Sequence, residues 1–251
     1  MKTIDLNCDL GESFGAYTLG MDAQVIPHIS SANIACGFHA GDPLVMQNTV
    51  ALCKQHGVAV GAHPGLPDLV GFGRRNMAIT PQEAKAAVMY QIGALQAFCK
   101  AADVPLRHVK PHGALYNMAA KDAALAKAIC EGIREIDAKL ILLALSGSAM
   151  ITAAKEMGLS CASEVFADRA YMPDGTLVPR SSPDAMIQDD QLAITRTVQM
   201  AVHGKVTALD GIDIAIEADS VCVHGDNAQA LTFVRHIRTA LETAKVRISA
   251  L

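Results

Sequence analysis

The chain has 251 residues, of which 51% are hydrophobic and only 18% are charged, and its formal net charge is −4. This length and composition are typical of a globular chain with a large core and exclude a disordered or fibrous protein. The negative balance and the lack of a Lys/Arg-rich run argue against a nucleic-acid partner.

The cysteines and the N-terminal residues bear on the compartment. Seven cysteines are present without a CxxC pair, which favours reduced thiols over a disulfide framework. Asp5 and Asp9 interrupt the apolar N-terminal stretch, so we expect no signal peptide. No run of about 18 uncharged apolar residues is present. We therefore expect a cytoplasmic protein without a membrane span.

Short apolar runs alternate with segments of helical period along the chain. The predicted strands are residues 3–9, 31–38, 58–65, 107–113, 139–145, 160–168 and 219–226. The predicted helices are residues 43–56, 80–101, 121–136, 147–157, 190–203 and 226–245, with a brief helix near 183–188. Pro43 and Gly57 bound the first helix, and Thr80 with Glu83 forms a capping box before the second.

This alternation predicts an α/β fold with a parallel sheet covered by helices. Seven near-continuous apolar strands favour a closed or nearly closed barrel that forms one domain over residues 1–251, and a doubly wound open sheet is the alternative. Two segments depart from the pattern. Residues 169–180 form an excursion with an Asp-Gly turn, and residues 206–217 read as a small hairpin around Asp210-Gly211.

Polar residues gather where the predicted strands end. Asp5, Asn7 and Asp9 alternate along the first strand, so their side chains project to one face, and Glu12 follows. Later strands carry or end in further polar residues, namely Asn33, His39, His63, Lys110, His112, Glu164, Arg169 and His224. Because the carboxyl ends of parallel strands lie on one side of the fold, we expect these residues to line one pocket.

Each of these positions also has a structural interpretation. A single histidine near a strand end is more often a hydrogen-bonded structural residue than a ligand. Asp42 and Asp226 are expected to cap helices, and Cys8, Cys36 and Cys222 to pack in the core. Four histidines that all end parallel strands are harder to explain in this way.

Two kinds of chemistry fit this set. Asp9, His39, His63 and His112 could bind a divalent metal that keeps open positions for water, and the activated water could attack an amide. Without a metal, a carboxylate of the first strand end could act as general base, a histidine could pass protons, and Lys110 could hold a carboxylate or phosphate. The spacing does not choose between these alternatives.

Phosphate-binding motifs give no support for nucleotide binding by this chain. Neither GxxxxGK[ST] nor GxGxxG occurs, so ATP, if it is used, is bound in another way or by a partner. Arg74 and Arg75 read either as solvated surface or as anion-binding groups on a mobile loop.

Long blocks of the sequence resemble the LamB/YcsF family. The blocks are DLNCDLGESFG, NIACGFHAGDP, GAHPGLPDLVGFGRR, VKPHGALYN, EVFADRAY and CVHGD, in the same order from residue 3 to about 226. The resemblance implies a (β/α)7-type barrel similar to glycoside hydrolase and polysaccharide deacetylase barrels. It also implies ATP-dependent opening of 5-oxo-L-proline, the cyclic amide of glutamate, to L-glutamate, with two further subunits, B and C.

The resemblance also implies cofactors and roles. ATP with Mg²⁺ is the expected cofactor, and the deacetylase barrels suggest Asp9, His63 and His112 as ligands of a divalent metal. For the chemistry, Asp9 or Glu12 is the expected base, with His63 and His112 beside the reacting carbon. The expected substrate-binding residues are Asn7, Asn33, His39, Lys110, Glu164, Arg169 and His224.

Within that set, Lys110 and Arg169 suit the phosphate or the substrate carboxylate. Two rival functions stay open: a stand-alone metal-dependent deacetylase or amidohydrolase, and a non-catalytic module that only binds partners. The density of ionisable groups argues against the second rival, because burying charge is costly and a binding module gains nothing from it.

Overall fold

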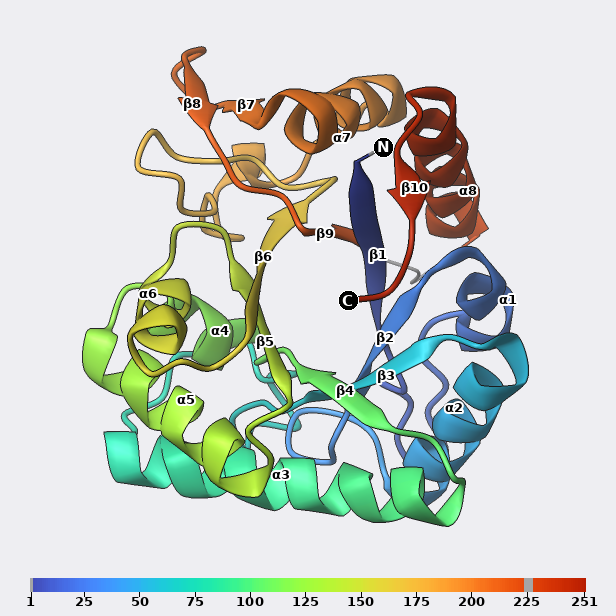
Figure 1. The fold of residues 1–251 in the computed structure, drawn as a ribbon, viewed down its shortest axis with the longest axis vertical. Helices are drawn as coiled ribbons and strands as arrows, with labels where there is room; N and C mark the ends of the chain where they lie inside the picture. The colour runs from blue at the N-terminus through green and yellow to red at the C-terminus, as the bar shows by residue number, and fades with distance from the viewer. Residues whose placement is uncertain (1, 224–227) are drawn as a thin grey trace.

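A computed structural model describes residues 2–223 and 228–251 of the chain. Seven parallel strands form a closed barrel in the order β1-β2-β3-β4-β5-β6-β9, in which β9 pairs with both β6 and β1. Figure 1 looks into this ring, with the long helices around its outside. The predicted (β/α)7-type barrel is confirmed, and the sheet is not the open, doubly wound alternative.

The predicted strands and long helices are all present, and their bounds differ mainly where predicted strands extended into polar loops. The barrel strands are β1 (Thr3–Leu10), β2 (Ser31–Ala35), β3 (Ala59–His63), β4 (Leu106–Val109), β5 (Ile141–Leu145), β6 (Cys161–Phe166) and β9 (Ser220–Val223). The long helices are α2 (Pro43–His56), α3 (Pro81–Ala101), α5 (Ala123–Ile136), α6 (Ala149–Glu156), α7 (Asp190–His203) and α8 (Ala228–Thr243).

The helix boundaries follow the capping chemistry. The Asp42 carboxylate accepts from the backbone N–H groups of Leu44 and Val45, so its predicted capping role is confirmed. The capping box of Thr80 and Glu83 is likewise present at the start of α3. The other expected cap, Asp226, lies outside the described residues.

Several short elements lack a periodic signal and were not predicted. They are α1 (Asp22–Val25), the 3₁₀ turn η1 (Ile26–His28), α4 (Gly113–Ala119) and β10 (Arg247–Ile248). The brief helix expected near 183–188 is the 3₁₀ turn η2 (Pro183–Ala185), and β7 (Lys205–Thr207) with β8 (Asp213–Ala215) forms the predicted hairpin. Such short elements contain too few residues for a hydrophobic period to show.

The C-terminal segment crosses the amino-terminal opening of the barrel. Strand β10 pairs with the start of β1, through Thr3 with Arg247. Farther along, the carbonyl of Leu251 accepts a hydrogen bond of 3.2 Å from Arg107, at the start of β4. The chain end therefore lies in the middle of the ring in Figure 1. A cavity opens at the other end of the barrel.

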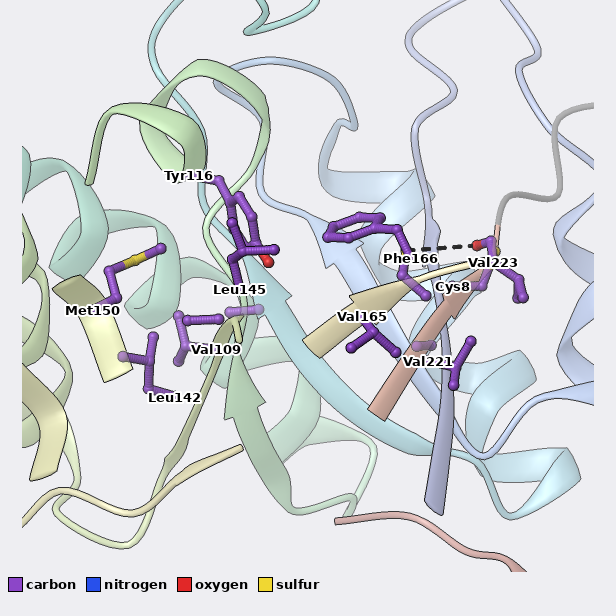
Figure 2. Close-up of a cluster of buried hydrophobic side chains, with 14 of the residues drawn as sticks. Cys8, Val109, Tyr116, Leu142, Leu145, Met150, Val165, Phe166, Val221 and Val223 are labelled. Atoms are coloured by element: carbon purple, nitrogen blue, oxygen red, sulfur yellow. Dashed lines mark hydrogen bonds between the residues drawn. The ribbon is translucent and has the colours of Figure 1, made fainter. Parts of the chain in front are cut away.

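The strands separate an apolar layer from a polar interior. Along β1, the even-numbered residues from Ile4 to Leu10 belong to the hydrophobic core, whereas Asp5 and Asn7 point the other way and are also fully buried. Figure 2 shows part of the apolar layer, where Val109 and Leu142 of neighbouring strands lie beside Met150 of α6.

All seven cysteines are free thiols, and Cys8, Cys36 and Cys222 are buried as expected. Among the described helices, none is long and apolar enough to cross a membrane.

Candidate active site

A cavity of about 950 Å³ opens at the carboxyl ends of the barrel strands. Six of the predicted site residues line it, namely Asp9, Glu12, His63, Lys110, His112 and Arg169. The interior residues Asn7, Asn33 and Glu164 are fully buried, and His39 is buried behind the ring of His112. His224 lies outside the described residues. The fold thus brings together residues of β1 and β3 and residues that follow β4 and β6, which are distant in the sequence.

Asp9 is fixed by donors on one of its two oxygens. Its Oδ1 accepts from Asn33 Nδ2 at 2.9 Å and from Lys110 Nζ at 2.8 Å. Its Oδ2 lies 3.3 Å from His63 Nε2. Because Oδ1 is engaged twice, Oδ2 is the oxygen that faces the histidines.

A chain of buried hydrogen bonds sets the orientation of Asn33. The Oδ1 atom of Asn33 lies 2.7 Å from His108 Nε2, and its Nδ2 also donates to Asn7 Oδ1 at 2.7 Å. Burial lowers the pKa of His108 to about 3, so its ring is neutral. Since an amide oxygen only accepts, the proton of His108 sits on Nε2 and keeps the amide nitrogen of Asn33 directed at Asp9.

Lys110 lies between two carboxylates. Its Nζ is 2.8 Å from both Asp9 Oδ1 and Glu164 Oε1, and it donates to Cys222 Sγ at 3.2 Å. Tyr116 in turn donates to Glu164 Oε2 at 2.7 Å. Burial opposes the charge of Lys110, but its neighbours, Asp9 first, outweigh this and hold the pKa of Lys110 well above its usual value. The charge of Lys110 is therefore balanced inside the barrel.

His63 and His112 face each other through ring nitrogens. His63 Nδ1 lies 2.7 Å from the Lys110 carbonyl, and His112 Nε2 lies 2.8 Å from the Phe72 carbonyl. Carbonyls only accept, so both of these nitrogens carry hydrogen. The remaining pair, His63 Nε2 and His112 Nδ1, is 2.9 Å apart. With neutral rings two lone pairs converge there, an arrangement that suits a cation: a shared proton or a metal ion.

His39 and Glu12 complete this centre. The ring of His39 stacks on that of His112 with centroids 3.6 Å apart, and His39 Nε2 lies 3.5 Å from Glu12 Oε1. Neither ring nitrogen of His39 has a hydrogen-bond partner within the part of the chain that the structure describes. Burial holds the pKa values of His39 and His112 well below their usual range, which favours neutral rings.

Ligand atoms from four residues converge at this centre. One atom each of Glu12, His39, His63 and His112 lies within 4.8 Å of all the others, so these residues form a cluster that could hold a metal. The cluster shares His63 and His112 with the expected ligand set. Asp9, the third expected ligand, lies at its edge against His63.

The loop after β3 packs closely against His39 and His112. Gly73 has a φ of 61°, and a Cβ there would lie 2.7 Å from His39 Cβ and 2.8 Å from His112 Cδ2. The preceding residue, Phe72, has a φ of 53°, which is costly for a side chain that is not glycine. This strained turn directs the Phe72 carbonyl at His112.

Comparison with known proteins places this geometry in a family. A model of the LamB/YcsF family matches residues 4–251. The chain belongs to the LamB/YcsF family. It is 62% identical over 248 residues to the A subunit of 5-oxoprolinase from Clostridium beijerinckii, with 99% of this chain and 97% of that protein covered. The protein of the same name from Bacillus subtilis is 55% identical over 251 residues, with 100% and 98% covered.

A solved relative has the same fold throughout. The crystal structure of a lactam utilization protein from Thermus thermophilus is 49% identical, covers 100% of both chains and superimposes with a TM-score of 0.94. The resemblance to the LamB/YcsF family that the motif blocks indicated is thus confirmed.

Arg169 has a visible structural role in this LamB/YcsF barrel. Its Nη2 donates to the Val178 carbonyl at 2.6 Å and its Nε to the Ala185 carbonyl at 3.3 Å. Burial lowers the pKa of Arg169 to about 10. The side chain therefore ties the 169–180 excursion, which forms one wall of the cavity, to η2.

Two further residues of the site were not singled out from the sequence. His108 on β4 and Lys110, which directly follows this strand, alternate as Asp5 and Asn7 do along β1, so the same period-2 argument could have identified His108. Tyr116 lies on the short helix α4, which has no sequence signal of its own, and its contact with Glu164 could not have been anticipated.

Proposed function

We propose that this chain is the ring-opening component of an ATP-dependent 5-oxoprolinase, which converts 5-oxo-L-proline to L-glutamate. Relatives named as the A subunit of 5-oxoprolinase, 62% and 55% identical over almost the whole chain, support this. The observation that carries it is the convergence of Asp9, His63 and His112 in one open cavity. Subunits B and C are the proposed partners, and ATP with Mg²⁺ is the proposed co-substrate of the complex.

The chemistry explains why ATP is needed. A lactam carbonyl is a poor electrophile because attack must break amide resonance. Transfer of the terminal phosphoryl group of ATP to the lactam oxygen makes the ring carbon electrophilic. Water then adds to that carbon, the C–N bond breaks as nitrogen takes a proton, and a second water hydrolyses the glutamyl phosphate to glutamate and phosphate. We assign the phosphoryl transfer to the partner subunits, because this chain has neither common phosphate-loop motif.

Asp9 is our choice for the base that activates water. Its Oδ1 is held by Asn33 and Lys110, so Oδ2 is the oxygen presented to the cavity side, next to His63. His63 can carry the proton from Asp9 toward the ring nitrogen. A positioned base contributes about 10²–10⁴-fold to such a step. Glu12 is the alternative base.

A divalent metal fits the same centre by its donor set. Glu12, His39, His63 and His112 would hold it through one carboxylate and three imidazoles, ligands typical of zinc and similar ions. When bound, such a metal would lower the pKa of a water molecule and polarise the carbonyl. This cluster is the observation in favour of the second candidate, a stand-alone metal-dependent deacetylase or amidohydrolase.

Reconstitution tests the main proposal. This chain is combined with subunits B and C, and ADP and glutamate are measured with 5-oxo-L-proline present. We expect Asp9→Asn to lower glutamate release by about 10³-fold while ATP hydrolysis continues. Asp210→Asn, at an exposed hairpin turn away from the cavity, is the matched control. Glutamate release by B and C alone would overturn the proposal, and full turnover by Asp9→Asn would remove Asp9 as the base and leave Glu12.

Metal analysis of the purified chain separates the two candidates. A stoichiometric, tightly held ion, together with amide hydrolysis that needs neither ATP nor partners, would establish the stand-alone hydrolase in place of the proposed function. Glutamate formation that requires ATP and all three subunits supports the proposed function, whether or not an ion is bound.

A further inference from the structure

The cations of the cavity fall into two sets. Lys110 and Arg169 lie deep and are bound internally, Lys110 by two carboxylates and Arg169 by two backbone carbonyls. Arg74, Lys121 and Arg180 line the same cavity but are exposed to solvent. The deep set is occupied in holding the protein together, whereas the outer set faces the space where a ligand would enter.

The outer cations come from three separate segments. Arg74 follows the strained turn after β3, Lys121 follows α4, and Arg180 ends the 169–180 excursion. The Arg74 guanidinium lies 4.9 Å from the centre of the Phe72 ring, a cation–π contact that places it beside the histidine centre. The next residue, Arg75, points to a different group: its Nε donates to Asp68 at 3.0 Å.

The charge of the outer cations is opposite in sign to the net charge of the whole chain. The chain carries 25 acidic and 21 basic residues, yet three exposed cations line one cavity. Among the ion pairs formed within residues 2–223 and 228–251, none joins Lys121 or Arg180 to a carboxylate. The carboxylates of the cavity, Asp9 and Glu12, lie at the histidine centre.

This polarity orients an anionic ligand. Asp9 and Glu12 repel negative charge at the inner end, so the anionic group of a substrate is directed to the rim. Arginine offers a planar fork of donors that matches phosphate, and lysine adds a point charge. At about 950 Å³ the cavity is also larger than a small lactam needs, and it has room for a charged substituent.

We propose that Arg74, Lys121 and Arg180 form an outer subsite that binds a phosphoryl group, so that the carbon bearing it lies toward Asp9. The inference rests on the proposed function, since it takes a phosphorylated ring as the ligand. The same chemistry could come from the phosphates of ATP itself. The two sources are distinguished by experiment.

The first test is binding of inorganic phosphate to the full chain at low salt, measured by calorimetry or NMR. Lys121→Ala with Arg180→Ala should weaken binding by about 10-fold or more, because each charge-assisted hydrogen bond contributes substantially. The matched control is Lys127→Ala with Arg134→Ala on α5, away from the cavity, which should bind phosphate like the parent. If both double variants bind phosphate equally, the bound phosphate is an adventitious ion only, and the inference is overturned.

The second test uses the complex with subunits B and C and measures glutamate formed per ATP hydrolysed. If the subsite holds the phosphorylated ring, the Lys121/Arg180 variant should lower this ratio several-fold while ATP hydrolysis continues. If it holds ATP, ATP hydrolysis itself falls and the isolated chain loses ATP binding. Both outcomes support a phosphoryl subsite. An unchanged ratio and an unchanged rate of ATP hydrolysis would overturn it.

Failure of this inference and failure of the proposed function give different results. Loss of phosphate binding in the rim variant together with glutamate release by subunits B and C alone would retain the subsite and remove the proposed function. Unchanged phosphate binding in the rim variant together with glutamate release that requires this chain would retain the proposed function and remove the subsite. The rim side chains are exposed, so we expect both double variants to fold with unfolding free energies within about 0.5 kcal/mol per substitution of the parent.

Discussion

The two ends of the barrel interior contain similar polar residues but differ in how these residues are satisfied. At the amino-terminal end, the Asp5 carboxylate is buried and accepts hydrogen bonds from three serine hydroxyls, those of Ser30, Ser31 and Ser220. Every one of these donors is local to the barrel wall. Among the described residues, both oxygens of Asp5 therefore have hydroxyl donors, and this end forms a closed hydrogen-bonded unit.

At the carboxyl-terminal end the polar atoms converge, but not all of them form hydrogen bonds with one another. Two ring nitrogens of His63 and His112 point at each other, and His39 has no hydrogen-bond partner among the described residues. Burying polar groups in this state costs free energy that the amino-terminal end avoids. Burial of a polar residue therefore does not mark the site, whereas incomplete pairing next to a cavity does.

Removal of the buried cation beside Asp9 should have the largest effect. Lys110→Met leaves Asp9 and Glu164 in the barrel without their shared countercharge, and we expect a loss of about 3–5 kcal/mol in the free energy of unfolding, measured with urea. Lys85→Met is the control, since its ion pair with Glu135 lies at the surface and should contribute about 1 kcal/mol or less. Equal losses in the two variants would contradict a structural role for the buried charge.

Metal addition tests the unpaired end directly. If the histidine cluster holds a divalent ion, zinc at 100 times its dissociation constant should raise the unfolding free energy by about 2.7 kcal/mol. His39→Gln should reduce that increase, because it removes one ligand from the cluster, whereas His56→Gln at the end of α2 should not. A chelator should reverse the effect. An identical response in both variants would place the ion elsewhere.

The fold was largely predictable because its signals are local. Alternating polar residues on β1 indicated the inward face, and capping residues such as Asp42 and Thr80 indicated helix starts. The position of a residue along the barrel axis has no such local signal. Asn7 pairs in register with Ser31 and Asp9 with Asn33, and this register decides that Asp9 reaches the cavity while Asn7 stays buried beneath it.

The candidate site was predictable in its members but not in its pairings. Strand ends indicated that Asp9, His63 and His112 would meet, because parallel strands end on one side. Which oxygen of Asp9 is engaged depends on side-chain packing that no spacing encodes. The contact between the strained turn at Phe72 and His112 has no sequence signal either, because the Phe72 carbonyl reaches His112 from 40 positions away in the sequence.

A smaller effect is expected from crowding the interior network. A Cβ at Gly61 would overlap the His108 ring, so Gly61→Ala must displace that ring from Asn33. We expect a loss of about 1–3 kcal/mol in unfolding free energy, and a fall in glutamate release as Asp9 loses its orientation. Gly93→Ala is the control: a Cβ there meets nothing within 4 Å, and alanine stabilises a helix by about 0.5–1 kcal/mol. A stabilised Gly61→Ala would show that His108 can move freely.

The smallest effect concerns the satisfied end. Burial raises the pKa of Asp5, even though its serine donors act in the opposite direction. The folded state therefore holds the Asp5 proton more tightly than the unfolded chain, whose carboxyl titrates near a pKa of about 3.9. Stability from this group is present below that value and is lost as pH rises through the folded pKa.

Asp5→Asn removes this titration. Relative to the variant, the parent should lose stability as pH increases from about 4, at no more than about 1.4 kcal/mol per pH unit. Unfolding free energies of both proteins measured across this range give the slope, and Asp210→Asn at an exposed turn should show no such trend. A difference that stays constant with pH would mean that the three hydroxyl donors fully offset burial. In that case a charged Asp5 carboxylate would be as stable at the amino-terminal end of the barrel as it is in water.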